Sequence, residues 1–225
     1  MTASAAMVQL KVVKGGGGGP GAALSCAQIL ALFDPEITFG AHEKMQGSLS
    51  KVEAYDPKLG KGYQAEHFPP AGTLHVSGRS GTLVSGAAGS SYSTSSGLTW
   101  MAHDGQTAGR EHKILTDRMR EFSQANDAAG RKATLDQWLG DYKEGVKDAL
   151  KKADPKRKIK KPPDLDEDAL IDQAAECIHA AAKQYFDEAG VGGGTELRNP
   201  WPATAEQHAA QAAQQADALA TAGAF

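Results

Sequence analysis

The second half of the chain contains a sequence pattern that is specific for the start of a helix. Thr134-Leu135-Asp136-Gln137 matches the capping box, in which the cap hydroxyl and the glutamine side chain bond each other's backbone amides. The apolar residues that follow recur every three or four positions: Leu135, Trp138, Leu139, Tyr142, Val146 and Leu150. This spacing predicts an amphipathic helix whose apolar face must pack against a core.

Further helices are expected on both sides of it. A short helix over 26–33 is capped by Ser25 and closed by Asp34-Pro35. Another should open at Asp104 or Thr107, with its apolar face at Ile114, Leu115, Met119 and Phe122. A later one should open near Asp164 and Glu167 and stop at Gly190, with its apolar residues at Leu170, Ile171, Cys177, Ile178, Tyr185 and Phe186. The Ala/Gln-rich tail from Ala203 suggests a thinly anchored helix that needs a partner or a second copy.

The first half is dominated by irregular segments and short strands. A strand-like stretch over 8–13 precedes the glycine run at 15–21, which reads as a linker because it lacks the Lys-Ser/Thr of a phosphate loop. Residues 36–65 look irregular until a short strand at Tyr63 and Ala65. A long Gly/Ser-rich loop fills 77–97, with a possible short strand at 82–84, before a strand at 98–101. The patterns together predict an α+β fold that is mostly helical.

The composition limits both the fold and the function. The chain has 225 residues, of which 40% are hydrophobic and 26 are glycine, so we expect a small core with long irregular connections. The formal net charge of −3 gives no overall basic field for nucleic acid. Cys26 and Cys177 define neither a disulfide framework nor a zinc finger, and we expect two reduced thiols on buried helix faces.

The start of the chain bears on its location. The stretch MTASAAMVQLKVVK has neither the basic beginning nor the apolar run of a secretory signal peptide. No window approaches the ~18 apolar residues of a membrane span. We therefore expect a protein that is made in the cytoplasm and has no membrane span. If it acts elsewhere, we expect a dedicated secretion system to export it.

Candidate functional residues gather around the stretch GYQAEHFPPAGTLH. Glu66 and His67 end a short strand, because Pro69 and Pro70 stop regular pairing there. At a frayed strand end the two side chains can converge on one point. A histidine at such a strand end should make few packing contacts with the core. Downstream, a strand leads to the pair His103-Asp104 at a helix entrance, and His112 falls on the first turns of that helix. Each of these residues taken alone is more often structural, but their order is that of a hairpin and a helix with polar ligands at each junction.

The other histidines give weaker signals. His179 sits beside the apolar face of its helix, where a structural role is expected, and His208 lies in the polar tail. His42 and His75 receive no assignment from the sequence.

The elements Glu-His-Phe-Pro-Pro, at 66–70, and Leu-Thr-Trp-Met-Ala-His-Asp-Gly-Gln-Thr-Ala-Gly, at 98–109, resemble a known family. The pattern is similar to the His-x-Pro … Met-x-x-x-Asp-His-x-x-Thr-Ala-Ser motif of HNH/endonuclease VII-like toxin nucleases, which are effectors of bacterial polymorphic toxins and secretion systems. The order His103-Asp104 here is the reverse of the family's Asp-His. The resemblance implies a ββα-metal fold, in which a hairpin and a helix hold one divalent ion, with additional C-terminal helices here.

The resemblance also implies roles for single residues. His67 would be the general base that activates water, and Glu66 would be a metal ligand together with His103 and Asp104. His112 completes a mixed nitrogen and oxygen set that suits one divalent ion, Mg²⁺, Mn²⁺, Zn²⁺ or Ni²⁺. The expected partners are nucleic acid, with DNA favoured over RNA, a cognate immunity protein and a secretion-apparatus protein.

A basic segment offers a way to hold a polyanion. Residues 151–163 carry seven lysines and arginines against the single acid Asp154. The residues expected to bind nucleic acid are Lys156, Arg157, Lys158, Lys160 and Lys161. An interdomain linker of the same composition would be equally basic, so this alternative stays open.

These predictions divide the chain into four parts. We expect a flexible N-terminal segment over 1–22, a nuclease-like domain over 23–152, a basic linker over 153–163 and a helical region over 164–225. Two other classes remain open. One is a non-enzymatic docking or structural protein of a secretion apparatus, and the other is a different hydrolase, which is disfavoured because His-Glu-x-x-His and Gly-x-Ser-x-Gly motifs are missing.

Overall fold

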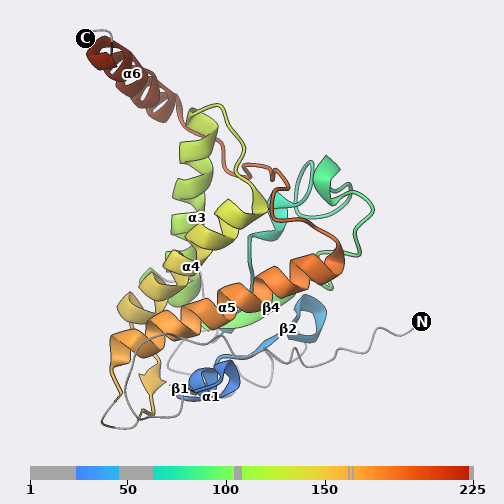
Figure 1. Cartoon of the computed structure of the whole chain (residues 1–225), viewed down its shortest axis with the longest axis vertical. Coiled ribbons are helices and arrows are strands. Elements are labelled where there is room, and N and C mark those ends of the chain that lie inside the picture. The colour runs from blue at the N-terminus through green and yellow to red at the C-terminus, as the bar shows by residue number, and fades with distance from the viewer. Residues whose placement is uncertain (1–23, 46–62, 104–107, 162, 164, 223–225) are drawn as a thin grey trace.

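The computed structural model describes residues 24–45, 63–103, 108–161, 163 and 165–222 (Figure 1). Its longer helices are α3 (Glu111–Ala128), α4 (Leu135–Lys152), α5 (Glu167–Ala189) and α6 (Ala205–Ala222), and α1 (Cys26–Ala31) is short. Its strands are β1 (Phe33–Asp34), β2 (Phe39–Ala41), β3 (Tyr63–His67), β4 (Leu98–His103) and β5 (Lys158–Ile159). The prediction of a mostly helical α+β fold is confirmed. The strand-like stretch at 8–13 and the linker at 15–21 lie outside these ranges.

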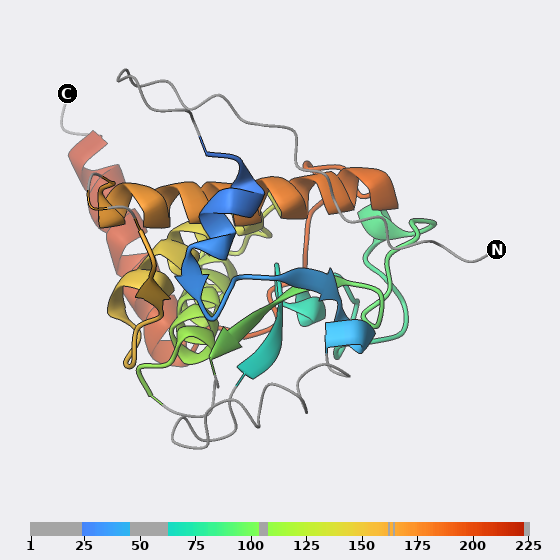
Figure 2. The ribbon, with the colours of Figure 1, turned by 90° about the horizontal axis from the view of Figure 1, so that it is seen from below.

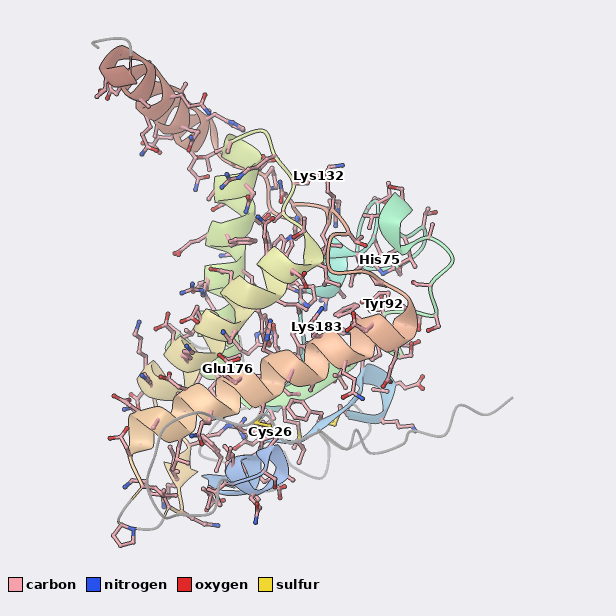
Figure 3. All side chains as sticks on the ribbon, in the orientation of Figure 1. Cys26, His75, Tyr92, Lys132, Glu176 and Lys183 are labelled. Carbon is pink, nitrogen blue, oxygen red and sulfur yellow. A yellow bond between two sulfur atoms is a disulfide. The ribbon has the colours of Figure 1, made fainter. Side chains whose placement is uncertain are left out.

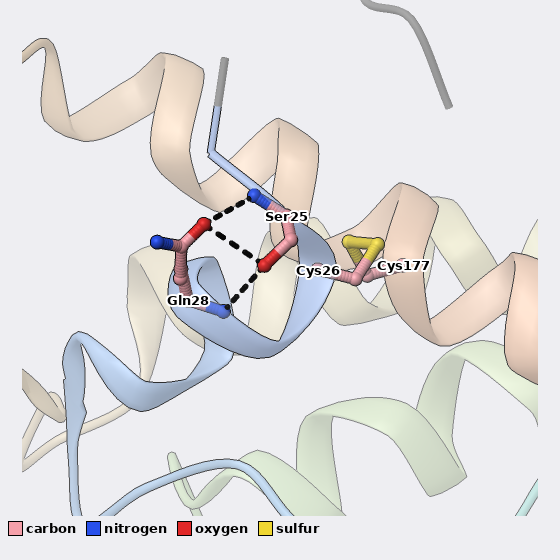
Figure 4. Close-up of a disulfide and its surroundings, with 4 residues drawn as sticks. All are labelled: Ser25, Cys26, Gln28 and Cys177. Atoms are coloured by element: carbon pink, nitrogen blue, oxygen red, sulfur yellow. Dashed lines mark hydrogen bonds between the residues drawn. A yellow bond between two sulfur atoms is a disulfide. The ribbon is translucent and has the colours of Figure 1, made fainter. Parts of the chain in front are cut away.

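Local capping signals position two helices as expected. Thr134 caps α4 with both bonds of a capping box, and all six apolar residues of the predicted face are buried. Ser25 caps α1 in the same way through Gln28 (Figure 4). Helix α1 ends before Phe33, however, because β1 pairs with β5 there.

The other two predicted starts are displaced. Helix α3 begins at Glu111, and its N-cap residue Arg110 makes no side-chain cap bond, so the prediction that Asp104 or Thr107 caps it is wrong. Helix α5 is capped by Asp166, whose carboxylate accepts from the Ala169 amide at 2.8 Å. It ends at Gly190, which takes the left-handed φ of 81° that glycine tolerates best.

The main sheet has three antiparallel strands in the order β2-β4-β3. In its register, Glu66 lies opposite Trp100, His67 opposite Thr99 and Tyr63 opposite His103. Helix α3 follows β4 along the chain, so a pair of antiparallel strands is followed by a helix, in the order that the sequence suggested. An irregular segment with two short 3-10 turns, Ala71–Thr73 and Ser85–Ala87, joins β3 to β4.

One hydrophobic core connects the sheet with the helices. It contains Trp100 of β4, Trp138 and Tyr142 of α4, and Ile178 and Phe186 of α5, all buried. Beneath α4, the Trp100 indole Nε1 donates to the Tyr142 hydroxyl at 2.7 Å. The core therefore crosses the boundary expected between 23–152 and 164–225, and both regions contribute to a single packed interior.

A disulfide joins Cys26 to Cys177, with an S–S distance of 1.99 Å (Figure 4). The prediction of two reduced thiols was wrong, although both cysteines do lie on buried helix faces. Helix α1 lies across α5, as Figure 2 shows from below, and this brings the two Cα atoms to 5.5 Å. That spacing lies in the range that a disulfide requires.

Helix α6 projects away from the rest of the molecule (Figure 1). Most of its described side chains are exposed. Its contacts are with the end of α3, where Gln207 donates to Gln124 at 3.1 Å and the His208 ring lies 3.8 Å from the Asp127 carboxylate. None of the helices that the structure describes is both long and apolar enough to span a membrane.

Candidate functional site

A pocket of about 460 Å³ opens where β3 ends and the chain leaves the sheet. Its polar lining residues are Glu66, His67, Arg79, His112, Thr116 and Arg198. Its remaining walls come from small residues at 65, 70–72 and 78 and from Pro200 and Trp201. Three segments far apart in the sequence, the end of β3 with the turn after it, the start of α3 and the chain after α5, thus meet at one point.

Glu66 and His112 are in direct contact in this pocket. The Glu66 Oε2 atom lies 2.6 Å from the His112 Nε2 atom, and the two side chains are 7% and 21% exposed. Because Glu66 is opposite Trp100, its side chain faces the helices, where the first turn of α3 presents His112. Burial raises the pKa of Tyr142 well above its usual range, and the negative charge of Glu66 adds to this shift. The structure thus brings together two of the four predicted metal ligands.

His67 is buried, with 4% of its surface exposed, so the expectation that it carries little packing was wrong. Its ring lies against that of His42, with the two centroids 4.3 Å apart and the ring planes tilted by 31°. The His67 Nε2 atom lies 3.0 Å from the Thr94 carbonyl oxygen, and it must donate there because a carbonyl only accepts. The Nδ1 atom is buried and has no hydrogen-bond partner among the residues that the structure places.

The electrostatic surroundings keep the His67 ring neutral. Burial lowers its pKa to about 4, the Thr94 carbonyl partly opposes the shift, and the charges of His42 and Arg79 add to it. At neutral pH the ring therefore has a proton on Nε2 and a free electron pair on Nδ1. A neutral imidazole with one nitrogen fixed by a backbone carbonyl is the form that general bases and metal ligands require.

The segment at 77–97 holds the His67 ring in place through a hydrogen bond. Thr94 accepts from His67 through its carbonyl, and its hydroxyl donates to the Arg79 carbonyl at 2.6 Å. The His75 ring, labelled in Figure 3, contacts the same hydroxyl at 2.9 Å and the Gly81 carbonyl at 3.1 Å. His75, which the sequence left unassigned, thus helps to fix the segment that orients His67.

His103 is separated from this pocket in the strand register. Its backbone lies opposite Tyr63, three residues before Glu66 in β3. At about 3.3 Å per residue, the two positions are roughly 10 Å apart along the sheet. Asp104, the fourth predicted ligand, lies outside the described residues.

Glu66 and His112 together provide only part of the coordination shell of a divalent ion. A carboxylate oxygen and an imidazole nitrogen are both ligands of Zn²⁺, Mn²⁺ or Ni²⁺. Within the residues of known placement, no group of three histidine, cysteine, aspartate or glutamate side chains is arranged to hold a metal. Glu66 and His112 would therefore need water, or groups from elsewhere, to complete a coordination shell.

Arg157 of the predicted nucleic-acid-binding set is buried instead of presented to solvent. Its Nε and Nη2 atoms donate to the two Glu111 carboxylate oxygens at 2.7 and 2.9 Å, and both side chains are at most 1% exposed. It also donates to the carbonyls of Pro35 and Met101. The sequence did not distinguish Arg157 from the neighbouring lysines, because a run of basic residues does not indicate which side chain is buried.

The four lysines of the set remain at the surface. Lys156, Lys158 and Lys160 are exposed, and Lys161 is partly buried. Lys160 lies 3.1 Å from the Asp34 carboxylate, and Lys161 donates to the Leu165 carbonyl. Because β5 pairs with β1, the segment expected to be a free linker over 153–163 is part of the fold.

Replacing Arg157 by alanine should lower the free energy of unfolding by about 3–5 kcal/mol, because the buried Glu111 carboxylate would lose the guanidinium that donates two hydrogen bonds to it. Replacing the neighbouring Lys158 by alanine is the matched control, since this exposed side chain should contribute no more than about 0.5 kcal/mol. Urea denaturation followed by circular dichroism measures both. Equal effects of the two substitutions would contradict the structural role of Arg157.

No family model matches the chain, and no curated protein or solved structure is significantly similar to it.

Proposed function

We propose that the protein is a metal-dependent endonuclease that hydrolyses phosphodiester bonds in the pocket at the end of β3. The observation that carries this proposal is the Glu66–His112 contact, which joins a strand end to a helix start beside the buried base His67. Three of the five residues expected to perform the chemistry thus line one pocket. The resemblance of the sequence to HNH/endonuclease VII-like toxin nucleases implies one divalent ion held between a hairpin and a helix.

His67 is proposed as the general base. Its Nε2 proton is held by the Thr94 carbonyl, so the proton of an attacking water must go to Nδ1. Its low pKa keeps Nδ1 unprotonated at neutral pH. An anionic phosphate placed nearby would raise the pKa of the ring towards the value at which a base is most effective.

Glu66 and His112 are proposed to hold the divalent ion. When bound, such an ion stabilises the negative charge that develops on the phosphate and on the leaving oxygen. The 2.6 Å contact between them places the carboxylate and the imidazole side by side in a partly buried setting. His103 and Asp104 are not needed for this pair, and their predicted roles as ligands stay predictions.

The proposal is tested by plasmid cleavage with and without a chelator. Purified protein is expected to cut plasmid DNA when Mg²⁺, Mn²⁺, Zn²⁺ or Ni²⁺ is supplied, and to lose this activity in excess EDTA. The double substitution Glu66→Gln and His112→Gln should raise the metal concentration needed for half-maximal cleavage, and exposed His208→Gln serves as the control. Cleavage that is unaffected by EDTA, or no cleavage of DNA or RNA with any of the four ions, would contradict the proposal.

The biological setting follows from the same proposal. A nuclease of this kind would be an effector toxin delivered by a dedicated secretion system, and a cognate immunity protein would protect the producing cell. The exposed lysines Lys156, Lys158 and Lys160, with the partly buried Lys161, would add electrostatic attraction to nucleic acid outside the pocket. The projecting α6 would instead favour the docking alternative, if the protein proves to have no catalytic activity.

A further inference from the structure

Arg198 is fixed in one wall of the pocket by hydrogen bonds to backbone carbonyls. Its Nε and Nη2 atoms donate to the Gly72 carbonyl at 3.0 and 2.8 Å, and Nη2 also donates to the Gly78 carbonyl at 2.7 Å. A side chain at Gly72 would crowd this arrangement, because its Cβ would lie 3.3 Å from Arg198 Nη2. The Arg198 Nη1 atom makes no hydrogen bond within the described part of the chain, so it remains free to donate to a ligand.

Arg79 adds a second positive charge to the same pocket. Its side chain is exposed, and neither Arg79 nor Arg198 forms an ion pair with any carboxylate in the described ranges. The sole acidic residue among those that line the pocket is Glu66, which is in contact with His112. No carboxylate among the described residues therefore neutralises the two guanidinium groups, and arginine is the residue best suited to hold a phosphate.

Trp201 places an aromatic surface beside these charges. Its backbone is held to the fully buried Ser123, whose hydroxyl donates to the Trp201 carbonyl at 2.9 Å and accepts from the Trp201 amide at 3.1 Å. The ring lines the pocket together with Arg198. An indole that lines the same pocket as two guanidinium groups offers separate places for the flat base and for the charged phosphate of one nucleotide.

We propose that the pocket takes a single nucleotide of single-stranded nucleic acid, with its phosphate on Arg79 and Arg198 and its base against Trp201. This inference rests on the proposed function, since it defines the substrate of that same pocket. The volume of about 460 Å³ is that of a small-ligand site. In a duplex each base is stacked and paired, whereas a single strand offers its base faces to an aromatic side chain.

The test is a binding measurement in EDTA, where cleavage is stopped. The probe is a fluorescein-labelled deoxyoligonucleotide of about ten bases, either single-stranded or annealed to its complement, and fluorescence anisotropy reports affinity. We expect the single strand to bind about tenfold more tightly than the duplex. Trp201→Leu should weaken single-strand binding roughly tenfold, while Trp201→Phe, which keeps an aromatic face, should retain most of it.

The proposed contact between Arg79 and a phosphate is tested by the salt dependence of binding. Arg79→Ala should reduce the slope of log affinity against log salt by about 0.7, the value for one phosphate contact on a single strand. The control is Lys132→Ala, another exposed cation that does not line the pocket (Figure 3). Because Arg79 is exposed, this variant should keep the unfolding midpoint of the wild type, and it serves even if a Trp201 variant unfolds.

The outcomes separate this inference from the proposed function. Equal binding of both probes, or wild-type affinity and salt slope in Trp201→Leu and Arg79→Ala, would overturn the single-nucleotide pocket even if plasmid is cut. Selective single-strand binding that depends on Trp201 and Arg79, in a protein that cuts no substrate, would support the pocket and refute the nuclease.

Discussion

Replacing both Cys26 and Cys177 by serine is expected to lower the free energy of unfolding by about 5 kcal/mol. The disulfide closes a loop with a sequence separation of 151 residues, and the entropy lost by the unfolded chain grows with the length of such a loop. The bond also attaches α1, a helix too short to be stable by itself, to the middle of α5. Loss of the bond should therefore release α1 from the core.

Urea denaturation of the oxidised and reduced wild type measures this effect. Dithiothreitol should shift the wild-type midpoint to that of the double serine variant, and it should leave the midpoint of the variant itself unchanged. A wild type that unfolds at the same urea concentration with and without reductant would show that the bond contributes nothing. If reduction does lower the midpoint, any cellular compartment that keeps thiols reduced would hold the protein in its less stable form.

His67→Gln is expected to lower the rate of phosphodiester cleavage by roughly 10²–10⁴-fold, the usual contribution of a general base. Glutamine is chosen because its Nε2 can still donate to the Thr94 carbonyl, whereas alanine would leave a cavity at this buried position. Plasmid cleavage at saturating metal measures the effect, with His208→Gln as an exposed control. Cleavage at the wild-type rate by a folded variant would remove His67 from the mechanism.

The same variant has a second readout in its acid stability. The pKa of His67 is about 4 in the folded protein and near 6.5 when the chain is unfolded. Between these values the unfolded chain binds a proton that the folded state excludes, so stability falls as pH drops through this window. In His67→Gln this part of the pH dependence should disappear. An unchanged slope of unfolding free energy between pH 6.5 and 4 would mean that the ring is not held neutral by burial.

Elements that depend on neighbouring residues could be predicted from the sequence. The capping box at Thr134 and the apolar face of α4 are both local patterns, and both are found in the fold. The strand end at His67 follows from the prolines after it. The start of α3 was misjudged, because Asp104 and Thr107 are good capping residues, yet the helix begins where Glu111 can reach Arg157.

Features that depend on distant pairs could not be read in advance. Nothing in the spacing of Cys26 and Cys177 indicates that α1 lies across α5. Arg79 and Arg198 are isolated residues in irregular segments, and only the fold brings them into one pocket. Glu66 and His112, two of the four predicted ligands, each lie at a recognisable junction of the sequence, whereas the strand register that separates His103 from Glu66 is a tertiary property.

The hydrogen bonds of Arg198 have a consequence for synthesis of the chain. His67 leaves the ribosome long before Arg198 and Trp201, which close the same pocket and hold the segment after β3 in place. Glu111, next to His112, likewise receives the two hydrogen bonds from Arg157 only after that later residue has been synthesised. A nascent chain that stops after α4 would contain every histidine of the pocket and yet lack one of its walls. The order of residues along the chain thus delays a complete site until almost the whole sequence has been translated.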